Sequence, residues 1–289
     1  MTLLRRRPGA LPWLLLAPGL VWLLVFFAIP LYYMAKVSLQ EGSVDTGYEL
    51  TWNFGVYPDA ISDFSEQFVR SFVYGGAATL LALLIAYPLA YAIAFHGGRW
   101  RNAMLLAVIA PFFTTYLIRT LSWQTILDDA SPVVDFLKTI GAIPSDGRVL
   151  ATSGSVIAGI TYNFLPFMIL PLYASLERID KRMLEAAYDL YSSRRAVMRK
   201  VVIPLSAPGI VAGTLLTFIP SVGDFINAEL LGTPRQSMIG NVIQSRYLEV
   251  TDYPTAAALS FILMAIILVM VGVWARIAGT EALMGAEAR

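Results

Sequence analysis

Side chains that carry out covalent or acid–base catalysis are scarce in this sequence. It has no cysteine and a single histidine, His96, which stands beside two glycines and reads as a loop residue. Catalytic proton transfer needs a positioned acid or base, and the long hydrophobic stretches contain no pair of carboxylates that could fill these roles. The sequence therefore argues against an enzyme embedded in a membrane, and it offers no candidate catalytic or metal-binding residue.

A phosphate-binding loop is absent as well. The loop that cradles ATP phosphates in many ATPases needs a lysine directly after a glycine, and each of the four lysines follows another residue type. We therefore expect no cofactor in this chain, and we place any ATP hydrolysis on a partner protein.

Hydrophobic and charged residues are distributed as in a membrane protein. Hydrophobic residues make up 57% of the chain and charged residues 14%, whereas a soluble domain has roughly 25% charged residues. Several stretches exceed the ~20 apolar residues that cross a bilayer. We predict an all-α membrane protein with six transmembrane helices, at about residues 11–34, 71–95, 103–127, 154–176, 201–223 and 253–275.

The basic residues give these helices a direction. Lysine and arginine concentrate on cytoplasmic segments, and fourteen of the 21 lie inside if the amino terminus is cytoplasmic. We therefore expect both termini inside, with a cytoplasmic segment at 1–10, a transmembrane domain at 11–276 and a cytoplasmic tail at 277–289. The first hydrophobic stretch is too long for a signal-peptide core and no convincing cleavage site follows it, so we expect it to be retained.

The loop at 177–203 is the longest one expected on the inner side, and its charges exclude it from the hydrocarbon. Asp180 can cap a helix at its start, and Ser192 can cap a second short helix. One face of the first helix is predicted to be apolar, because the following residues repeat with helical spacing: Leu184, Ala187, Tyr188 and Tyr191. This pattern alone leaves two interpretations, an amphipathic anchor on the membrane surface or a lever on which another protein acts.

The same loop resembles the coupling motif of ABC-importer permease subunits, which reads Glu-Ala-Ala, three residues, Gly, nine residues, Ile-x-Leu-Pro. The spacing is kept, although Tyr191 stands where the family usually has glycine, and Ser192 and Ser193 can supply the bend instead. The resemblance implies the type I ABC importer permease fold, with a cytoplasmic coupling helix between transmembrane helices 4 and 5 that docks on a separate ATPase. The residues that carry this expected coupling role are Glu185, Ala186, Ala187, Tyr191 and Pro204.

Other segments narrow the resemblance to the spermidine/putrescine branch of this family. Residues 111–123 look like the third span of polyamine-type permeases, and the segments 223–225, 230–232, 238–241 and 256–260 also fit that branch. Permeases for iron, thiamine or other small solutes share parts of this pattern and remain alternatives. An ion-coupled secondary transporter is a weaker alternative, because such carriers usually keep titratable groups near the middle of the bilayer.

The resemblance also implies partners and a location. We expect a dimer of ATP-binding subunits that holds ATP and Mg, a second permease subunit that in this family is usually a different chain, and an extracytoplasmic solute-binding protein. Lipid should surround the chain in the bacterial inner membrane, which it crosses several times. Nothing in the sequence points to nucleic acid.

A polyamine would need carboxylates for its charges and aromatic faces for cation–π contact. Fourteen of the 20 acidic residues fall on the expected outer side, which would attract cations, although any positive-inside protein shows this skew. The candidate substrate-path residues are Asp224, Phe225, Trp123, Tyr116 and Glu229. The alternatives are a solvated helix-end acid or a structural partner for Asp224, and membrane anchoring for the two aromatic residues of the third span.

Arg119 is a charge within the third predicted span. Such charges usually face protein or water and pair with another group. One interpretation is a structural pair with Asp224 or Asp128, and the other is that the side chain reaches out to the outer membrane interface.

Overall fold

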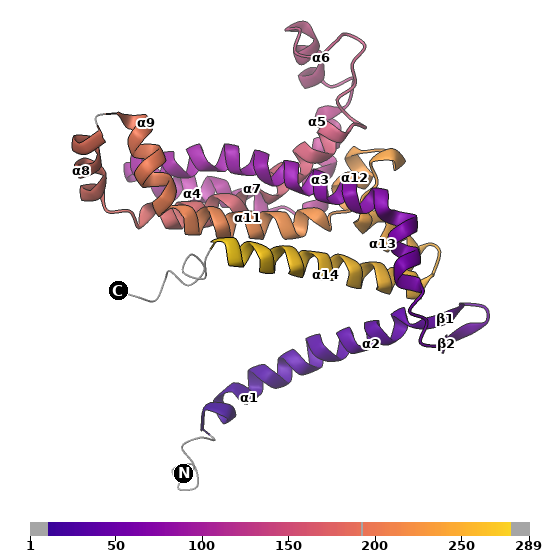
Figure 1. The fold of residues 1–289 in the computed structure, drawn as a ribbon. Coiled ribbons are helices and arrows are strands. Elements are labelled where there is room, and N and C mark those ends of the chain that lie inside the picture. The colour runs from indigo at the N-terminus through magenta and orange to yellow at the C-terminus, as the bar shows by residue number, and fades with distance from the viewer. Residues whose placement is uncertain (1–10, 192, 279–289) are drawn as a thin grey trace. The chain divides into compact units, whose positions relative to one another are not determined.

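The computed structural model describes residues 11–191 and 193–278 (Figure 1). These residues divide into two compact units, one formed by residues up to Asp63 together with Ile243–Leu263, the other by Phe64–Val242 together with the residues from Met264 onward. The three boundaries fall inside helices, two of them in the long helices α3 (Val56–Tyr91) and α14 (Tyr253–Ala278) and one in the shorter α13 (Ile239–Leu248). The predicted segment 1–10 and residues 279–289 of the predicted tail lie outside the described residues.

The first unit begins with one continuous apolar helical stretch. It comprises α1 (Leu11–Leu23), the π-helical segment η2 (Leu24–Ala28) and α2 (Ile29–Ser38). Residues Trp13–Ser38 are long and apolar enough to cross a membrane. The prolines of this stretch do not end it, since a helix in a membrane tolerates proline where other groups satisfy the freed carbonyl.

The segment 36–70, which lies between the first two predicted spans, contains two regular elements that the sequence did not indicate. A β-hairpin forms from β1 (Gln40–Ser43) and β2 (Gly47–Leu50), with Glu41 opposite Glu49, so the described chain is not purely α-helical. Helix α3 then starts at Val56, about four turns before the predicted start, and has a kink at Phe64. Neither element was predicted, because the polar composition of this segment is typical of a loop.

Tyrosines hold the first unit together. The Tyr48 hydroxyl donates to the carbonyl of Thr251, and the Tyr48 ring lies 5.4 Å from that of Tyr253. The hydroxyls of Ser38 and Tyr57 are 2.8 Å apart. Helix α13 (Ile239–Leu248), most of which belongs to this unit, brings in Tyr247, whose ring is 5.1 Å from Tyr253.

The second unit is built around α7 (Ser153–Glu177), which lies beside α3 and α11 (Ala207–Val222) in Figure 1. Every fourth residue of α3 along this contact is an alanine, and the four are fully buried: Ala78, Ala82, Ala86 and Ala90. Residues spaced by four share one helix face. Small residues on that face let two backbones approach closely, which is how helices associate inside a membrane.

The contact between α7 and α11 uses glycine in the same way. Gly209 and Gly213 stand four residues apart on α11, in a small-x-x-x-small pattern. A Cβ atom at Gly209 would lie 2.5 Å from the Ser175 Cβ and 2.7 Å from the Pro171 carbonyl oxygen. Because one of these neighbours is backbone, a side chain at this position would force the helices apart.

We therefore expect Gly209→Ala to destabilise the protein by about 1–3 kcal/mol, the usual cost of overpacking a tight core. Thermal unfolding of the detergent-solubilised protein measures this effect. Gly76→Ala is the matched control, because a Cβ at Gly76 has no neighbour within 4 Å. Equal melting temperatures for the two variants would contradict the close helix contact.

Two of the predicted spans are broken. The third consists of α4 (Arg101–Ile109) with η5 (Ala110–Phe113), then α5 (Tyr116–Leu127) at 94° to them. The fifth bends by 64° between residues 205 and 207. Four described helices are long and apolar enough to cross a membrane, and six if each bent pair counts as one span. The predicted count of six matches this upper value.

The segments predicted as outer loops contain short helices. The segment 133–140, whose apolar residues have the spacing of a surface helix, forms α6 (Pro132–Thr139), and Ser131 caps it by accepting a hydrogen bond from the Val134 amide at 3.2 Å. The turn-rich segment 224–252 folds into α12 (Ile226–Leu231), η7 (Pro234–Gln236) and α13. The sequence thus indicated α6, but not the helices of the segment 224–252.

Candidate coupling and translocation site

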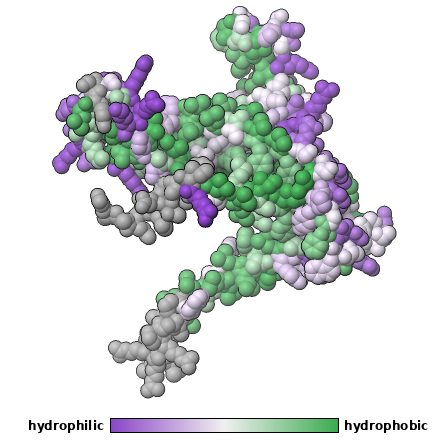
Figure 2. Space-filling model, viewed as in Figure 1, coloured by the Kyte–Doolittle hydropathy of each residue, from purple (hydrophilic) through white to green (hydrophobic). Residues whose placement is uncertain are grey.

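The loop predicted to couple the chain to a partner forms a helical elbow. Helix α8 (Lys181–Tyr191) is followed by α9 (Arg194–Val197), the π-helical segment η6 (Met198–Val202) and α10 (Ile203–Leu205), which contains Pro204. We call residues 181–205 the elbow. Hydrophilic side chains gather at the end of the second unit where α8 and α9 lie (Figures 1 and 2).

The two helix caps that the sequence predicted, Asp180 and Ser192, belong to the helices of the elbow. The Asp180 carboxylate accepts a hydrogen bond from the Arg182 amide at 2.9 Å, as expected for a residue that caps the start of α8. Helix α9 is capped by Ser193, whose hydroxyl accepts from the Ala196 amide at 3.2 Å. The prediction named Ser192, which lies outside the described residues. The described cap is therefore one residue further along than predicted.

One face of α8 packs against the rest of the second unit. Leu184 and Ala187 are buried and belong to an apolar cluster with Leu176, Val197 and Val202. This result confirms the predicted apolar face at these two positions. The backbone of Tyr191 belongs to α8, but the structure does not describe its side chain.

The opposite face of α8 is exposed and partly apolar. Glu185 and Ala186 are exposed, and Leu190 exposes 77% of its surface and Met183 50%. Met183, Ala186 and Leu190 are spaced by three and four residues, so they share one side of the helix. The prediction did not include Met183 and Leu190, although their seven-residue spacing was visible in the sequence.

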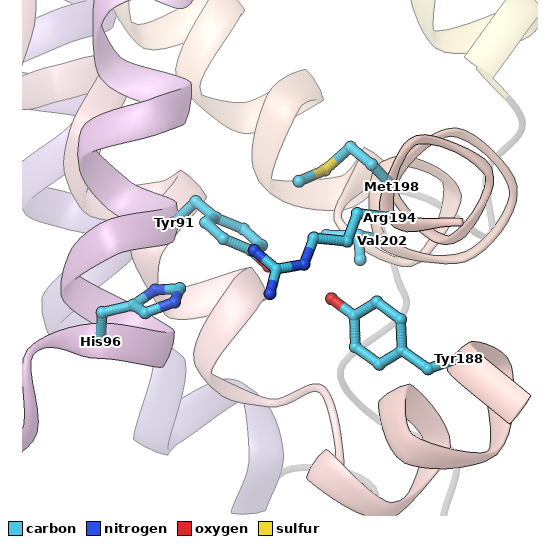
Figure 3. Close-up of a pocket in the computed structure, with 6 residues that line it drawn as sticks. All are labelled: Tyr91, His96, Tyr188, Arg194, Met198 and Val202. Carbon is cyan, nitrogen blue, oxygen red and sulfur yellow. The ribbon is translucent and has the colours of Figure 1, made fainter. Parts of the chain in front are cut away.

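A cavity of about 520 Å³ lies under the elbow. Figure 3 shows the Arg194 guanidinium reaching toward Tyr91, with the Tyr188 hydroxyl facing the same space and His96 at its edge. The predicted loop residue His96 ends the π-helical segment η3 (Ala92–His96). Met198 and Val202, the two ends of η6, also line this cavity.

The cavity is thus bordered by two π-helical segments, η3 and η6. π-Helical turns are rare, and they recur at functional sites because their wider turn leaves hydrogen bonds less well formed. The cavity thus places a π-helical segment of the elbow, η6, next to the π-helical end of α3, η3.

The end of α7 next to the elbow is held in place. Arg101, at the start of α4, pairs with Glu177 and donates to the Tyr173 hydroxyl. Its guanidinium also lies 5.0 Å from the centre of the Tyr173 ring. A displacement of the elbow would therefore be transmitted to both α7 and α4.

A second group of candidate residues meets near the other end of α7. Asn227 is the centre of this polar cluster, and its amide group donates to Asp224 at 3.1 Å. Asn163, on α7, donates to Thr120 and to Asn227, both at 3.1 Å. The Tyr116 hydroxyl donates to the Asp224 carboxylate. Residues of α5, α7 and α12 thus meet in one hydrogen-bonded cluster, in which Tyr116 and Asn227 contact the Asp224 carboxylate.

Asp224 is 7% exposed, so it is not a solvated helix-end acid in this conformation. It lies between α11 and α12, and its carboxylate accepts a hydrogen bond from the Asn227 amide, in the first turn of α12, at 2.8 Å. Burial raises the pKa of Asp224, and the hydrogen bonds from Tyr116 and Asn227 oppose this rise. The carboxylate is therefore buried but supplied with donors, as a structural partner or a cation-binding group would be.

The other candidate path residues are not all in this cluster. The Trp123 ring packs against Tyr162 at 5.3 Å, while the Phe225 carbonyl accepts from the Asn241 side chain at 2.9 Å. Glu229 is exposed on α12. Of the predicted set, Tyr116 and Asp224 share a side-chain hydrogen bond, and the Glu229 amide donates to the Phe225 carbonyl at 2.9 Å. No sequence pattern pointed to Asn163 or Asn227.

Arg119 is buried near this cluster but has no described ion-pair partner. The predicted pairing with Asp224 or Asp128 is not observed within the described residues. The guanidinium lies instead 4.9 Å from the centre of the Phe112 ring and 5.6 Å from that of Tyr116. The alternative prediction, a side chain at the membrane interface, does not fit its burial.

The sequence matches a known family model along nearly its whole length. The model describes the binding-protein-dependent transport system inner membrane component, and it covers residues 8–278. The chain belongs to this family. Members supply the membrane-crossing, non-catalytic part of such transport systems, and the apolar helices of this permease fit that assignment.

Individual relatives are similar along most of the permease. The spermidine/putrescine transport system permease protein PotB of Haemophilus influenzae is 34% identical over 265 residues, which cover 88% of this chain and 90% of that protein. PotB of Escherichia coli is 33% identical over 256 residues, with 88% and 93% covered. The inner membrane ABC transporter permease protein YdcU of Escherichia coli is 34% identical over 213 residues, with 70% and 67% covered.

Solved structures support the fold. A chain of a bacterial ABC transporter that imports the acidic polysaccharide alginate matches with a TM-score of 0.66 at 19% identity, covering 93% of this permease and 94% of that chain. A chain of the MetNI methionine ABC transporter, in an inward-facing conformation, matches with a TM-score of 0.56 at 15% identity, covering 75% and 96%. The predicted ABC-importer permease fold is confirmed.

Proposed function

We propose that this permease is a subunit of an ATP-driven importer that carries a polyamine, spermidine or putrescine, across the bacterial inner membrane. The observation that carries the substrate class is its identity of 33–34% to PotB proteins from two genera, over about nine tenths of those proteins. Permeases of one family that carry different solutes can be this similar in sequence. A permease for iron, thiamine or another small solute is therefore the second candidate.

We infer that the energy comes from a pair of ATP-binding subunits, which hold ATP and Mg. The exposed face of α8, with Glu185, Ala186 and Leu190, would lie in a groove on one of them, a mode of recognition common for helices. Closure of the two ATPases would move the elbow against η3 and pull on α7, which precedes the elbow directly in the chain, and α7 would pull on α4 through the contact of Arg101 with Glu177.

The remaining partners follow from the same proposal. A second permease subunit, a different chain, would complete the pathway, and a solute-binding protein would deliver the polyamine from outside. Both termini would lie in the cytoplasm, together with the elbow. The seven basic residues between Arg178 and Lys200 support this orientation under the positive-inside rule.

For the substrate path, we propose that the polar cluster around Asp224 binds an ammonium group. A carboxylate beside the Tyr116 ring offers the two features that attract an organic cation, a negative charge and an aromatic face. Because Tyr116 and Asn227 already occupy the carboxylate, the cluster would have to open before a cation could bind. The other three candidates would line the route by which the polyamine approaches the cluster and would not contact the bound ammonium group: Phe225, Trp123 and Glu229.

The test is ATPase activity of the complex reconstituted with its ATP-binding subunits, second permease and binding protein. Spermidine or putrescine should stimulate hydrolysis, and uptake into proteoliposomes should require ATP. Stimulation by thiamine or iron alone would transfer the proposal to those solutes. Uptake driven by an ion gradient without ATP would reject an ATP-driven importer.

A further inference from the structure

Arg119 is a buried cation whose acceptor is missing from the described part of the chain. Only 9% of its surface is exposed, and its Nε and Nη1 atoms are buried without a hydrogen-bond partner. A guanidinium cannot lose its charge in a protein. The rings of Phe112 and Tyr116 cover it, but two aromatic faces do not replace the hydrogen bonds that a buried charge requires.

The guanidinium lines a cavity of about 360 Å³ formed by α3, α4, η5, α5 and α7. It is the one charged side chain among the lining residues, and the walls are otherwise mostly apolar. Leu89 and Met104 line the cavity while remaining about 40% exposed, so it is open at the side where α3 and α4 lie. A group that enters from this side approaches Arg119 and would pair with its Nε and Nη1 atoms after a small shift of the side chains that cover them.

The chemistry of the cavity restricts what this group can be. A free inorganic anion would lose its hydration shell among apolar walls. A lipid phosphate belongs at the membrane surface, whereas Arg119 lies in the broken span formed by residues 98–127. The apolar helices α1 and α2 of the first unit carry no acidic residue and so cannot supply a carboxylate. An acidic side chain from another membrane-embedded chain meets all these conditions.

We propose that an aspartate or glutamate of the second permease subunit enters this cavity and pairs with Arg119. This inference rests on the proposed function, because it takes the second subunit from there. A carboxylate matches the planar donor geometry of a guanidinium and forms two parallel hydrogen bonds with it. Burial of both partners would make the pair a determinant of which permease this chain assembles with.

The absence of native cysteine permits a direct test on the complete complex in membranes. Met104→Cys, at the cavity mouth, is labelled with a benzophenone maleimide and irradiated, and the adduct is identified by mass spectrometry. We expect a peptide from a membrane helix of the second permease that contains an acidic residue. Leu84→Cys is the control, because Leu84, on α3, is 61% exposed but does not line the cavity, and its adducts should be with lipid.

Arg119→Gln should reduce co-purification of the second permease at least tenfold, whereas Arg119→Lys should retain part of it. Exchange of the charges, with Arg119→Glu combined with arginine at the cross-linked acid, should restore assembly. Adducts of the cavity position with lipid alone, or its modification by a charged water-soluble thiol reagent in the assembled complex, would overturn the proposal. If no second permease co-purifies with the unmodified chain, the proposed function itself fails instead.

Discussion

Glu185→Lys is expected to abolish substrate-stimulated ATP hydrolysis in the reconstituted complex while leaving membrane insertion intact. Glu185 is exposed on α8 and is not among the described ion pairs, so its replacement leaves no buried group in this chain without a partner. Truncation of one member of a buried interfacial charge pair costs about 2–5 kcal/mol or more. At about 1.4 kcal/mol for each tenfold change, ATPase docking would weaken by more than tenfold, and reversed charge adds repulsion.

The elbow offers two comparisons for this variant. Asp189→Lys places the same charge change on another exposed residue of α8 and should have a smaller effect if Glu185 makes the specific contact. Leu190→Ser keeps the charge and removes an apolar contact, so it should weaken docking by an intermediate amount. Normal stimulation in the Glu185→Lys complex would exclude Glu185 from the docking surface.

Helix α8 could be predicted from the sequence, whereas the surroundings of Asp224 could not. Helix α8 is specified locally, since a cap at Asp180, an apolar face and a dense run of charges all lie within its own residues. Its place outside the hydrocarbon therefore followed from composition, and Leu184 and Ala187 are buried as predicted. The prediction of its exposed face was incomplete, because the seven-residue spacing of Met183 and Leu190 places them on one side of the helix without showing whether that side is exposed or buried.

Asp224 depends on residues far from it in the chain. Its hydrogen bond with Tyr116 joins positions 108 residues apart, and the hydrogen bond between Asn163 and Asn227 joins positions 64 apart. Hydropathy measures the composition of a segment, but it does not show which helix faces pack against each other. The 94° break of the third span was missed for the same reason, since the extended Thr114 and Thr115 lie within an apolar window.

Asp224→Asn is expected to reduce polyamine uptake at least tenfold while changing the amount of assembled complex by less than twofold. Asparagine keeps one acceptor oxygen and can still accept the hydrogen bond from the Asn227 amide. It removes the charge, so an ammonium group loses a charge-assisted hydrogen bond, which is about twice as strong as a neutral one. Uptake of radiolabelled spermidine into proteoliposomes, with KM and maximal rate determined separately, measures the effect.

Asp146→Asn is the matched control, because it removes one negative charge from an exposed residue of another predicted outer segment. A general electrostatic attraction of cations would make the two variants similar, whereas a local site affects only Asp224→Asn. Unchanged kinetics in Asp224→Asn would remove this carboxylate from the path. A lower melting temperature with normal uptake would make it purely structural.

The pH dependence of uptake gives a further measurement on the same residue. Binding of an ammonium requires the ionised carboxylate, and burial raises the pKa of Asp224 above that of an ordinary aspartate. Uptake should therefore decline as the pH falls, beginning above the usual aspartate range near ~3.9. Tyr116→Phe removes a hydrogen bond that lowers this pKa, so the decline should start at a still higher pH. Identical pH profiles for the two proteins would show that the Asp224 carboxylate does not control the step that limits uptake.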